Sequence, residues 1–350
     1  MRIGLTYDLR DHYRALGFGE EETAEFDPPS TIDAIEGVLR GLAHETVRIG
    51  NVRELARRLA AGERFDLVFN TAEGIEGPGR EAQVPALLDA FGVPYTFGDP
   101  LVCALTLHKG MTKRVMRDAG VPTPPFCVVE DERDLDDVRL PFPLFVKPVA
   151  EGTAKGIDGA SRVGDPEALR ARCREVLARY RQPALVEPFL PGREFTVGIL
   201  GGGRGAAVLG TLEVALLAGA EPDSYTYLNK ERCEDLCAYS LADRVAAAPA
   251  EQVALAAWRA VGGVDAGRVD VRLDAAGRPQ VLEVNALPGL HPTHSDLPMI
   301  ASAVGLAYAE LIGSIVRSAA SRARARFQER SAPARLPRLD THPSAAAPSA

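Results

Sequence analysis

The clearest chemical pattern lies in residues 267–289, where polar and apolar side chains alternate as in two strands joined by a tight turn. Folding these strands about the turn places Asp270 opposite Glu283, and Arg268 opposite Asn285. Cross-strand partners point to the same side of a sheet and lie about 5 Å apart at Cβ. The pattern therefore predicts two carboxylates and an amide oxygen on one face, beside an arginine.

A metal ion is the first chemistry that this group suggests. Carboxylates this close repel each other unless a cation lies between them. Ligand sets made only of oxygen suit a hard ion such as Mg²⁺. The simpler alternative is a solvated hairpin face on which acids and arginines offset each other. Pro288 and Gly289 favour the metal site, because they end the second strand at a rigid turn with an approachable backbone N–H.

Groups that could bind phosphate lie elsewhere in the chain, as expected if Mg²⁺ held by two carboxylates also binds phosphate oxygens. Lys109 begins a helix and Lys147 ends an apolar strand, although a solvated side chain is the simpler interpretation of either lysine alone. The small-residue loop 151–156 could wrap phosphates with backbone amides, but it lacks the spacing of a Walker A loop. Residues 187–190 offer an apolar slot for adenine, with an ordinary interdomain link as the alternative.

The composition argues against several classes of function. The 350-residue chain has a net charge of −8 and a pI of about 5.4, so a nucleic-acid-binding surface is not expected. The five cysteines form no CxxC pair and predict small core residues with reduced thiols, typical of a cytoplasmic protein. No segment resembles a signal peptide or a membrane span, so we expect no membrane partner.

The order of predicted strands and helices divides the chain into four segments. Residues 1–100 alternate strand and helix with short links, which indicates a parallel sheet covered by helices. Three further segments follow: a central unit at 101–185, a C-terminal unit at 186–325 that carries the hairpin, and a disordered tail at 326–350 rich in Pro, Ala, Ser and Arg. Residues 214–245 are expected to form a long, irregular, polar stretch.

Five stretches of the chain form a specific combination. They are FDLVFNTAEG, GVPYTFGDPLVCALTLHKGMTK, PLFVKPVAEGTAKGI, LVEPFLPGREFTVGIL, and GRVDVRL followed by VLEVNALPGL. In these stretches, which run from about Phe65 to Leu311, the chain resembles the D-alanine–D-alanine ligases of the ATP-grasp superfamily in order and spacing. The VKP, EFTVGIL and EVN-x-x-PG segments are specific together, so the resemblance extends to fold and reaction type.

The resemblance implies an α/β protein with the ATP-grasp fold, made of an N-terminal Rossmann-like parallel α/β domain, a small central domain and a C-terminal α+β domain. It implies an ATP-dependent carboxylate–amine ligase that works through an acyl phosphate, with two Mg²⁺ ions or Mn²⁺ in their place. The favoured activity is D-alanyl-D-alanine formation from amino-acid substrates, for peptidoglycan synthesis in the cytoplasm. The alternatives are a ligase for a different amino acid or small carboxylate, and a catalytically silent nucleotide-binding regulatory module. The family is commonly dimeric, so a homodimer is expected.

The resemblance also implies roles for individual residues. The metal ligands would be Asp270, Glu283 and Asn285. The catalytic residues would be Arg268 and the N–H of Gly289, which stabilise the oxyanion of the tetrahedral intermediate, and Lys230 in a loop that closes over the nucleotide. The ATP-binding residues would be Lys109 and Lys147 at the phosphates, Glu187 and Leu190 at adenine, Glu194 at the ribose, Leu282, and Thr153, which stands where the family usually has a serine beside the substrate.

The departures from the family concentrate on the amino-acid side of the site. The family's N-terminal Ser-x-Glu-Arg-Glu-Val-Ser loop is absent, and a longer segment at 8–30 contains several acids, including Glu25, that could bind the substrate ammonium. Glu73 stands where the family often has a histidine, and Glu231 where a tyrosine usually orders the closing loop. Ser295 lies in a loop after the hairpin that is one residue longer and would bind the second substrate's carboxylate. The nucleotide and metal residues are therefore present, while the substrate residues differ.

Overall fold

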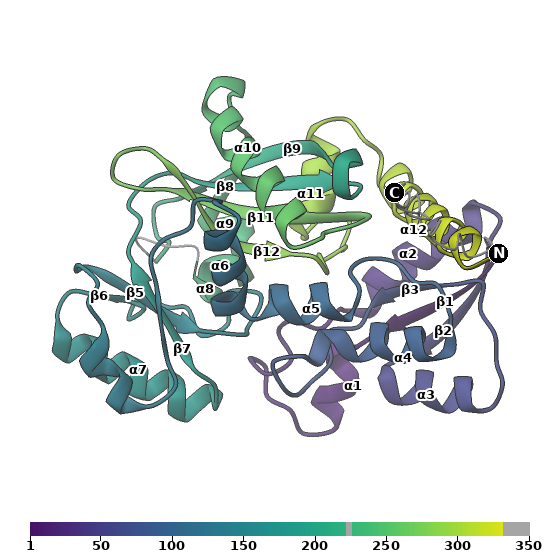
Figure 1. The fold of residues 1–350 in the computed structure, drawn as a ribbon, viewed down its shortest axis with the longest axis horizontal. Helices are drawn as coiled ribbons and strands as arrows, with labels where there is room; N and C mark the ends of the chain where they lie inside the picture. The colour runs from purple at the N-terminus through teal and green to yellow at the C-terminus, as the bar shows by residue number, and fades with distance from the viewer. Residues whose placement is uncertain (222–225, 332–350) are drawn as a thin grey trace, which may run out of the picture.

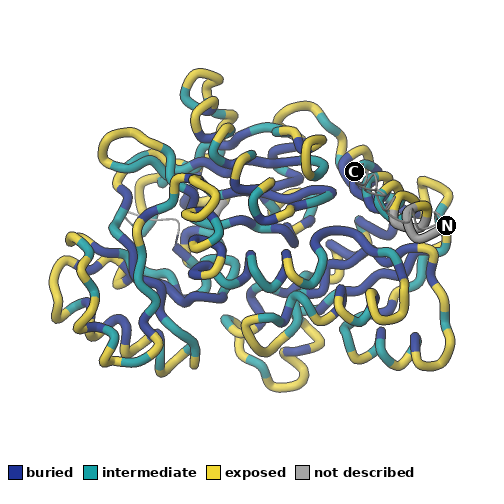
Figure 2. Tube along the Cα trace, viewed as in Figure 1, coloured by how far each residue is buried: buried dark blue, intermediate teal, exposed yellow. Residues whose placement is uncertain are grey.

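The computed structural model describes residues 1–221 and 226–331, which form three β-sheets with helices packed against them (Figure 1). The sheets follow one another along the chain. Their strands are mostly buried, whereas loops and the outer faces of helices are exposed (Figure 2). The predicted mixed α/β fold, with one parallel sheet, is confirmed.

The N-terminal sheet is parallel, with strand order β2-β1-β3. Its strands are β1 (Arg2–Tyr7), β2 (Glu45–Gly50) and β3 (Leu67–Thr71). The helices of this part are α1 (Arg10–Ala15), α2 (Pro29–Gly41), α3 (Val52–Ala60), the 3₁₀ helix η1 (Arg80–Ala82) and α4 (Gln83–Phe91). Helical connections are needed because a tight turn cannot join parallel neighbours.

The central sheet is antiparallel, with strand order β4-β7-β5-β6. Its strands are β4 (Cys127–Val129), β5 (Leu144–Pro148), β6 (Arg162–Val163) and β7 (Ala184–Pro188). The helices here are α5 (Pro100–Leu107), α6 (Lys109–Asp118), the 3₁₀ helix η2 (Glu132–Asp137) and α7 (Pro166–Tyr180). Lys109 begins α6, as predicted, because the His108 side chain accepts a hydrogen bond from Met111 N–H (3.2 Å) and caps the helix.

The C-terminal sheet is antiparallel, with strand order β10-β9-β8-β11-β12. Its strands are β8 (Glu194–Leu200), β9 (Ala207–Leu216), β10 (Cys237–Leu241), β11 (Ala266–Leu273) and β12 (Pro279–Asn285). The helices are the 3₁₀ helix η3 (Gly203–Gly205), α8 (Tyr227–Glu231), α9 (Cys233–Leu236), α10 (Arg244–Ala260), α11 (Asp296–Ala303) and α12 (Tyr308–Ser331).

The stretch at 214–245, predicted to be irregular, is largely ordered in the described residues, and that prediction was wrong. It contains the end of β9, the short helices α8 and α9, and strand β10. β10 pairs antiparallel with β9 from Cys237 opposite Leu216 to Leu241 opposite Leu212. This pairing joins distant segments, and so the local polar composition did not indicate it.

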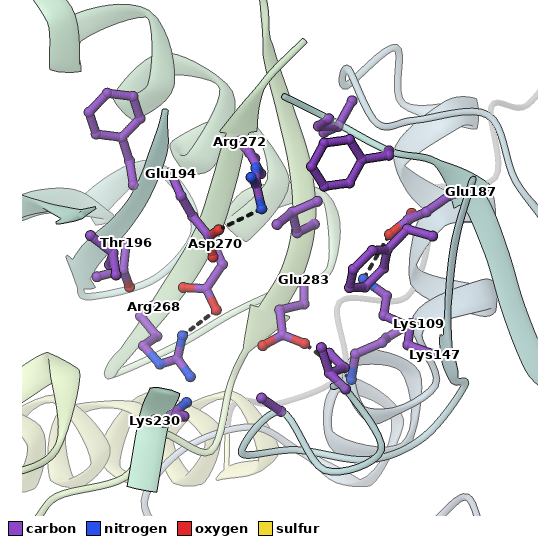
Figure 3. Close-up of a pocket in the computed structure, with 18 of the residues that line it drawn as sticks. Lys109, Lys147, Glu187, Glu194, Thr196, Lys230, Arg268, Asp270, Arg272 and Glu283 are labelled. Atoms are coloured by element: carbon purple, nitrogen blue, oxygen red, sulfur yellow. Dashed lines mark hydrogen bonds and ion pairs between the residues drawn. The ribbon is translucent and has the colours of Figure 1, made fainter. Parts of the chain in front are cut away.

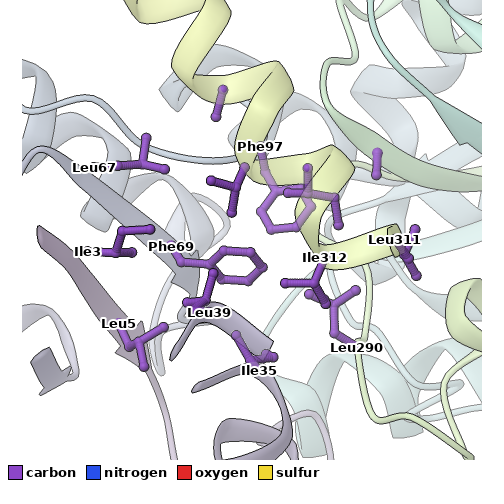
Figure 4. Close-up of a cluster of buried hydrophobic side chains, with 14 of the residues drawn as sticks. Ile3, Leu5, Ile35, Leu39, Leu67, Phe69, Phe97, Leu290, Leu311 and Ile312 are labelled. Atoms are coloured by element: carbon purple, nitrogen blue, oxygen red, sulfur yellow. The ribbon is translucent and has the colours of Figure 1, made fainter. Parts of the chain in front are cut away.

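A hydrophobic core joins the N-terminal sheet to the end of the chain (Figure 4). Ile3 and Phe69 from the sheet belong to one cluster with Ile312 of α12 and with Leu290, which follows the β11–β12 hairpin. All four side chains are almost completely buried. Burying an apolar side chain of this size contributes about 1.5–3 kcal/mol. The loop after the hairpin is therefore anchored against the N-terminal sheet.

The ends of two predicted segments differ from the elements observed. α12 continues to Ser331, so the first residues of the predicted tail at 326–350 are helical, whereas 332–350 lie outside the described residues. The predicted boundary after residue 185 falls inside β7, which pairs with β4 and β5. The division into domains stays a prediction.

None of the described helices could by itself cross a membrane, judged by length and hydropathy. Only α11 and α12 together pass that test, as a pair bent by 115°.

Candidate active site

The β11–β12 hairpin has the predicted register at its functional residues. Asp270 pairs with Glu283, and Arg268 pairs with Asn285. The register shifts after Asp270, where Val271 pairs with Val281, so that Leu282 is an extra residue on the second strand. Strict alternation would turn Leu282 away from Glu283, but this bulge lets both line the same cleft.

The hairpin carboxylates form a group that fits a hard cation. Asn285 Nδ2 lies 3.3 Å from Asp270 Oδ2 and 3.4 Å from Glu283 Oε1, and Arg268 donates a hydrogen bond to Asp270. Asp270 Oδ1 is buried and has no hydrogen-bond partner among the described residues. Burial raises the pKa of Asp270 to about 6, with the charge of Glu283 adding to the effect.

The third candidate metal ligand is an amide. Within the described ranges, no three His, Cys, Asp or Glu side chains converge as a metal site, so a site here depends on Asn285. Rotating this amide by half a turn would exchange the positions of its nitrogen and oxygen, so that the oxygen could bind a cation held by Asp270 and Glu283. Two carboxylates and an amide oxygen suit Mg²⁺.

Lysines face the hairpin from across the cleft (Figure 3). Lys109 Nζ lies 3.1 Å from Glu283 Oε2. Burial would raise the pKa of Glu283, but Lys109, with Arg268 and Lys147, outweighs burial and holds that pKa well below its ordinary value. These positive charges therefore keep one hairpin carboxylate ionised.

Two residues that line the cleft, Lys147 and Glu187, belong to a buried group of three ionised side chains. Glu187, on β7, is within 2.8 Å of both Lys147 Nζ and Lys113 Nζ. Burial by itself would raise the pKa of Glu187, but the two lysines outweigh burial and lower that pKa to about 2. Lys113 shares this one carboxylate with Lys147. Burial therefore outweighs the attraction of Glu187 and lowers the pKa of Lys113 to about 8. Sequence reasoning missed Lys113, because a lysine on a helix is usually solvated.

The cleft has an apolar end suited to an aromatic base. Phe145, Phe189, Leu190 and Leu282 line it together with polar residues. Arg272 Nη1 lies 3.1 Å from Glu194 Oε2, and the Arg272 guanidinium lies 5.2 Å from the centre of the Phe189 ring. Arg272 is a second residue that the sequence analysis did not select.

The small-residue loop 151–156 borders the cleft and is held by the N-terminal part of the chain. Glu25 accepts hydrogen bonds from Gly152 N–H and from Arg80 Nη2, the latter at 2.7 Å. Arg80 Nη1 also donates to Ala150 O (2.8 Å). The side chains of Arg80 and Glu25 are only 6 % and 7 % exposed. Glu25 therefore fixes the loop, although the sequence proposed it for the substrate ammonium.

Other predicted substrate residues are distributed around this region. Burial raises the pKa of Glu73 well above its ordinary value, and the neighbouring Glu81 adds to the shift. Burial raises the pKa of Glu81 to about 7. The side chain of Glu231 lies outside the described part of the structure. A Cβ atom on Gly289 would come within 2.8 Å of Ser295 Oγ, so the two residues are in close contact.

The far end of the cleft contains an acid that the sequence did not indicate. Asp296 Oδ2 lies 3.3 Å from Arg268 Nε and 4.0 Å from Lys230 Nζ. Asp296 is the first residue of α11, where an acid is commonly explained by the helix dipole, and so its position gave no functional signal.

Most of the predicted site residues meet in this one cleft. Those that line it are Lys109, Lys147, Glu187, Leu190, Glu194, Lys230, Arg268, Asp270, Leu282 and Glu283. Those that do not line it directly are Thr153, Asn285, Gly289, Glu25, Glu73 and Ser295. Thr153 adjoins Ala154, which does line the cleft; both have a positive φ, of 51° and 55°. The individual roles of all these residues stay predictions.

Known proteins resemble this chain in sequence and in fold. The family model described as "D-ala D-ala ligase C-terminus" matches residues 115–317. A D-alanine–D-alanine ligase of Bordetella petrii is 38 % identical over 270 residues, covering 77 % of this chain and 79 % of the relative. An uncharacterised protein of Sinorhizobium fredii is 35 % identical over 308 residues, covering 81 % of this chain and 85 % of the relative. The crystal structure of a D-alanine–D-alanine ligase from Bacillus anthracis matches with a TM-score of 0.72 and 22 % identity, covering 93 % of this chain and 99 % of that one.

Proposed function

The chain belongs to the D-alanine–D-alanine ligase family, and we propose that it uses ATP to join two D-alanine molecules into D-alanyl-D-alanine, releasing ADP and phosphate. The observation that carries this proposal is the pairing of Asp270 with Glu283 across the hairpin, facing Lys109 and Lys147. Acids and lysines on opposite walls of one cleft are the arrangement that a metal-bound triphosphate needs.

ATP would lie along the cleft, with its base at the apolar end. Glu187 and Leu190 would contact adenine, and Glu194 would accept hydrogen bonds from the ribose hydroxyls. Lys109 and Lys147 would bind the phosphates, with Thr153 and its loop beside them. The bulge at Leu282 supports this placement, since it adds an apolar side chain to the wall that holds the carboxylates.

Asp270, Glu283 and Asn285 would hold two Mg²⁺ ions, or Mn²⁺. When bound, these ions offset the negative charge of the phosphate oxygens. The unpartnered oxygen of Asp270 supports this assignment, because a buried carboxylate oxygen is normally satisfied.

The reaction would proceed in two steps. The carboxylate of the first D-alanine attacks the γ-phosphorus of ATP; the bond to the bridging oxygen breaks, ADP leaves, and an acyl phosphate remains. The amine of the second D-alanine then attacks the acyl carbon, loses a proton, and expels phosphate. Arg268 and the N–H of Gly289 would stabilise the oxyanion between these events. Loss of one such donor typically raises the barrier by about 3–4 kcal/mol.

Water must be kept from the acyl phosphate, which hydrolyses readily. The loop 151–156 is positioned for this task, because Glu25 and Arg80 fix it from the N-terminal side. Lys230, on α8, would close the other side of the cleft. With this activity, we propose a cytoplasmic location, a role in peptidoglycan synthesis and a homodimeric assembly.

A second candidate is a ligase for a different amino acid. Both carboxylate oxygens of Glu25 are already engaged by the protein. A substrate ammonium would therefore have to bind a group other than Glu25. The catalytically silent nucleotide-binding module is disfavoured, because Arg268 and the acids Asp270 and Glu283 line the cleft together.

The test is phosphate release from Mg·ATP across a panel of amino acids, with products identified by mass spectrometry. Release with D-alanine, together with D-alanyl-D-alanine, supports the proposal. Release only with another acid supports the second candidate. No release with any substrate would contradict both ligase functions and leave the nucleotide-binding module.

A further inference from the structure

Thr196, on β8, carries a buried hydroxyl at the wall of the cleft. The residue lines the cleft on the same wall as Asp270 (Figure 3). It is 4 % exposed, and its Oγ1 atom is buried without a hydrogen-bond partner among the described residues. A buried hydroxyl that forms no hydrogen bond destabilises the folded protein. Because buried polar groups are normally satisfied, this hydroxyl indicates a partner that is not part of the chain.

The register of the sheet places this hydroxyl next to a predicted metal ligand. β8 lies between β9 and β11, and Thr196 pairs directly with Asp270. Directly opposed residues point to the same side of a sheet, with Cβ atoms about 5 Å apart. Asp270 Oδ1 is also buried without a partner in the described part of the chain. Two polar atoms on one wall of the cleft therefore await partners, and they do not bond to each other.

A hydrated divalent cation would satisfy both atoms. Mg²⁺ prefers six oxygen ligands, loses water reluctantly and usually keeps several water molecules in protein sites. A water molecule on such an ion is polarised by the charge and is a strong hydrogen-bond donor. The hydroxyl of a threonine can accept that hydrogen bond. It also brings no charge, so Thr196, unlike a further carboxylate, would not repel the triphosphate.

We propose that Thr196 is a positioning residue of the metal site: its hydroxyl accepts a hydrogen bond from a water ligand of the Mg²⁺ held by Asp270. This inference rests on the proposed function, because it requires Asp270 to bind Mg²⁺ together with ATP. Groups that hydrogen-bond to the ligands of a metal ion typically change metal affinity by about 10–100-fold when they are removed. Thr196 thus strengthens Mg²⁺ binding and destabilises the protein without the ion.

Two other roles for Thr196 make different predictions. Glu194, two residues earlier on the same strand, is the proposed partner of the ribose. If Thr196 bonded directly to the nucleotide in the same way, loss of its hydroxyl would weaken ATP binding even without Mg²⁺. If the hydroxyl only supported the fold, its loss would lower stability and leave ATP binding unchanged. Only a bond to the hydrated ion confines the effect to the contribution of Mg²⁺.

The experiment compares Thr196→Val with Thr196→Ser. Valine keeps the branched shape and lacks the hydroxyl, whereas serine keeps the hydroxyl. Calorimetry measures the Kd of ATP in EDTA and in excess Mg²⁺, without D-alanine so that no ligation occurs. The ratio of the two values is the Mg²⁺-dependent increase in ATP affinity. We expect Thr196→Val to reduce this ratio by about tenfold, and Thr196→Ser to restore most of it. The Kd in EDTA should be the same in all three proteins.

Stability supplies a second measurement, which needs no ligand. Removing a hydroxyl that has no partner should leave the urea midpoint of Thr196→Val unchanged or raise it. Thr211→Val is the matched control, because it makes the same exchange on the neighbouring strand β9, at a residue that does not line the cleft. Thr211 Oγ1 donates a hydrogen bond to Glu251 Oε1 (2.8 Å). This control should therefore lose stability and keep the full Mg²⁺-dependent increase.

The possible results separate this inference from the proposed function. The same Mg²⁺-dependent increase in the wild type and in Thr196→Val would overturn the inference alone. Weaker ATP binding by Thr196→Val in EDTA would also overturn it, in favour of a direct bond to the nucleotide. A wild type whose ATP affinity does not change with Mg²⁺ would overturn the metal site of the proposed function, and the inference with it.

Discussion

Replacing Glu187 by Gln removes the one carboxylate that two buried lysines at the cleft share. The substitution exchanges one oxygen for nitrogen and keeps the shape of the side chain. It leaves Lys113 and Lys147, both 2.8 Å away, without their carboxylate. The side chains of all three residues are at most 6 % exposed, so water does not replace the lost partner. We expect the variant to fold with a large loss of stability.

The magnitude follows from the pKa of Glu187. The lysines lower it from 4.5 to about 2 in the folded protein. At about 1.4 kcal/mol per pKa unit, this corresponds to roughly 3 kcal/mol of stability at neutral pH. Breaking a buried ion pair by removing one partner typically costs about 3–5 kcal/mol, which agrees.

The pH dependence has a defined sign. A carboxylate whose pKa is lowered on folding contributes its full stabilisation above its ordinary pKa of 4.5. That contribution is lost as the pH falls from 4.5 toward 2, by about 1.4 kcal/mol per pH unit. The part of the stability difference between the wild type and Glu187→Gln that comes from this carboxylate should therefore shrink below pH 4.5.

Urea unfolding at several pH values measures this difference. Trp258, the single tryptophan, is fully buried behind the hairpin strands and reports the transition by fluorescence. Glu54→Gln, which removes a solvated pair with Arg57, is the control and should not move the urea midpoint. An unchanged midpoint for Glu187→Gln at neutral pH, or a difference that grows below pH 4.5, would refute the reasoning.

Three further variants test other parts of the site and fold. Asp270→Asn should reduce phosphate release by about a hundredfold or more while circular dichroism stays unchanged, and normal turnover would remove the metal assignment. Glu25→Gln weakens the contacts that fix the loop 151–156, so more acyl phosphate should be lost to water and phosphate released per dipeptide should rise above one to one. A ratio that stays at one to one would show that Glu25 is not needed to exclude water. Arg322→Met leaves the fully buried Asp265 without its guanidinium, 2.6 Å away. The free energy of unfolding should fall by about 3–5 kcal/mol while the KM for ATP changes by less than about twofold, and a large KM change would place this pair in the site.

The hairpin could be predicted because its geometry is local. A short turn and alternating side chains fix which residues of two neighbouring strands face each other, so Asp270 and Glu283 could be paired without tertiary information. The bulge that brings Leu282 into the cleft could not be predicted in the same way. Regular alternation along the second strand would have turned Leu282 to the face opposite Glu283, and the residue types do not show where an extra residue interrupts the pairing.

Tertiary contacts also explain the residues that were missed. Lys113 resembles a solvated helical lysine until β7 places Glu187 beside it. Asp296 resembles an ordinary helix-start acid until the hairpin brings Arg268 within 3.3 Å. Glu25 was predicted to bind the substrate ammonium because it lies in the acidic N-terminal segment. Its partner Arg80 comes from a separate segment, and together they fix the loop 151–156. In each case, the residue type was visible in the sequence and its partner was not.

Calorimetric titration of ATP with and without Mg²⁺, for the wild type and for Asp270→Asn, tests the central claim most directly. If the hairpin acids hold a metal that bridges to the triphosphate, the wild type should bind ATP about tenfold or more tightly with Mg²⁺, and Asp270→Asn should lose that gain. Equal ATP affinity with and without Mg²⁺ in the wild type, or the same increase in affinity with Mg²⁺ in both proteins, would contradict a metal site at the hairpin acids.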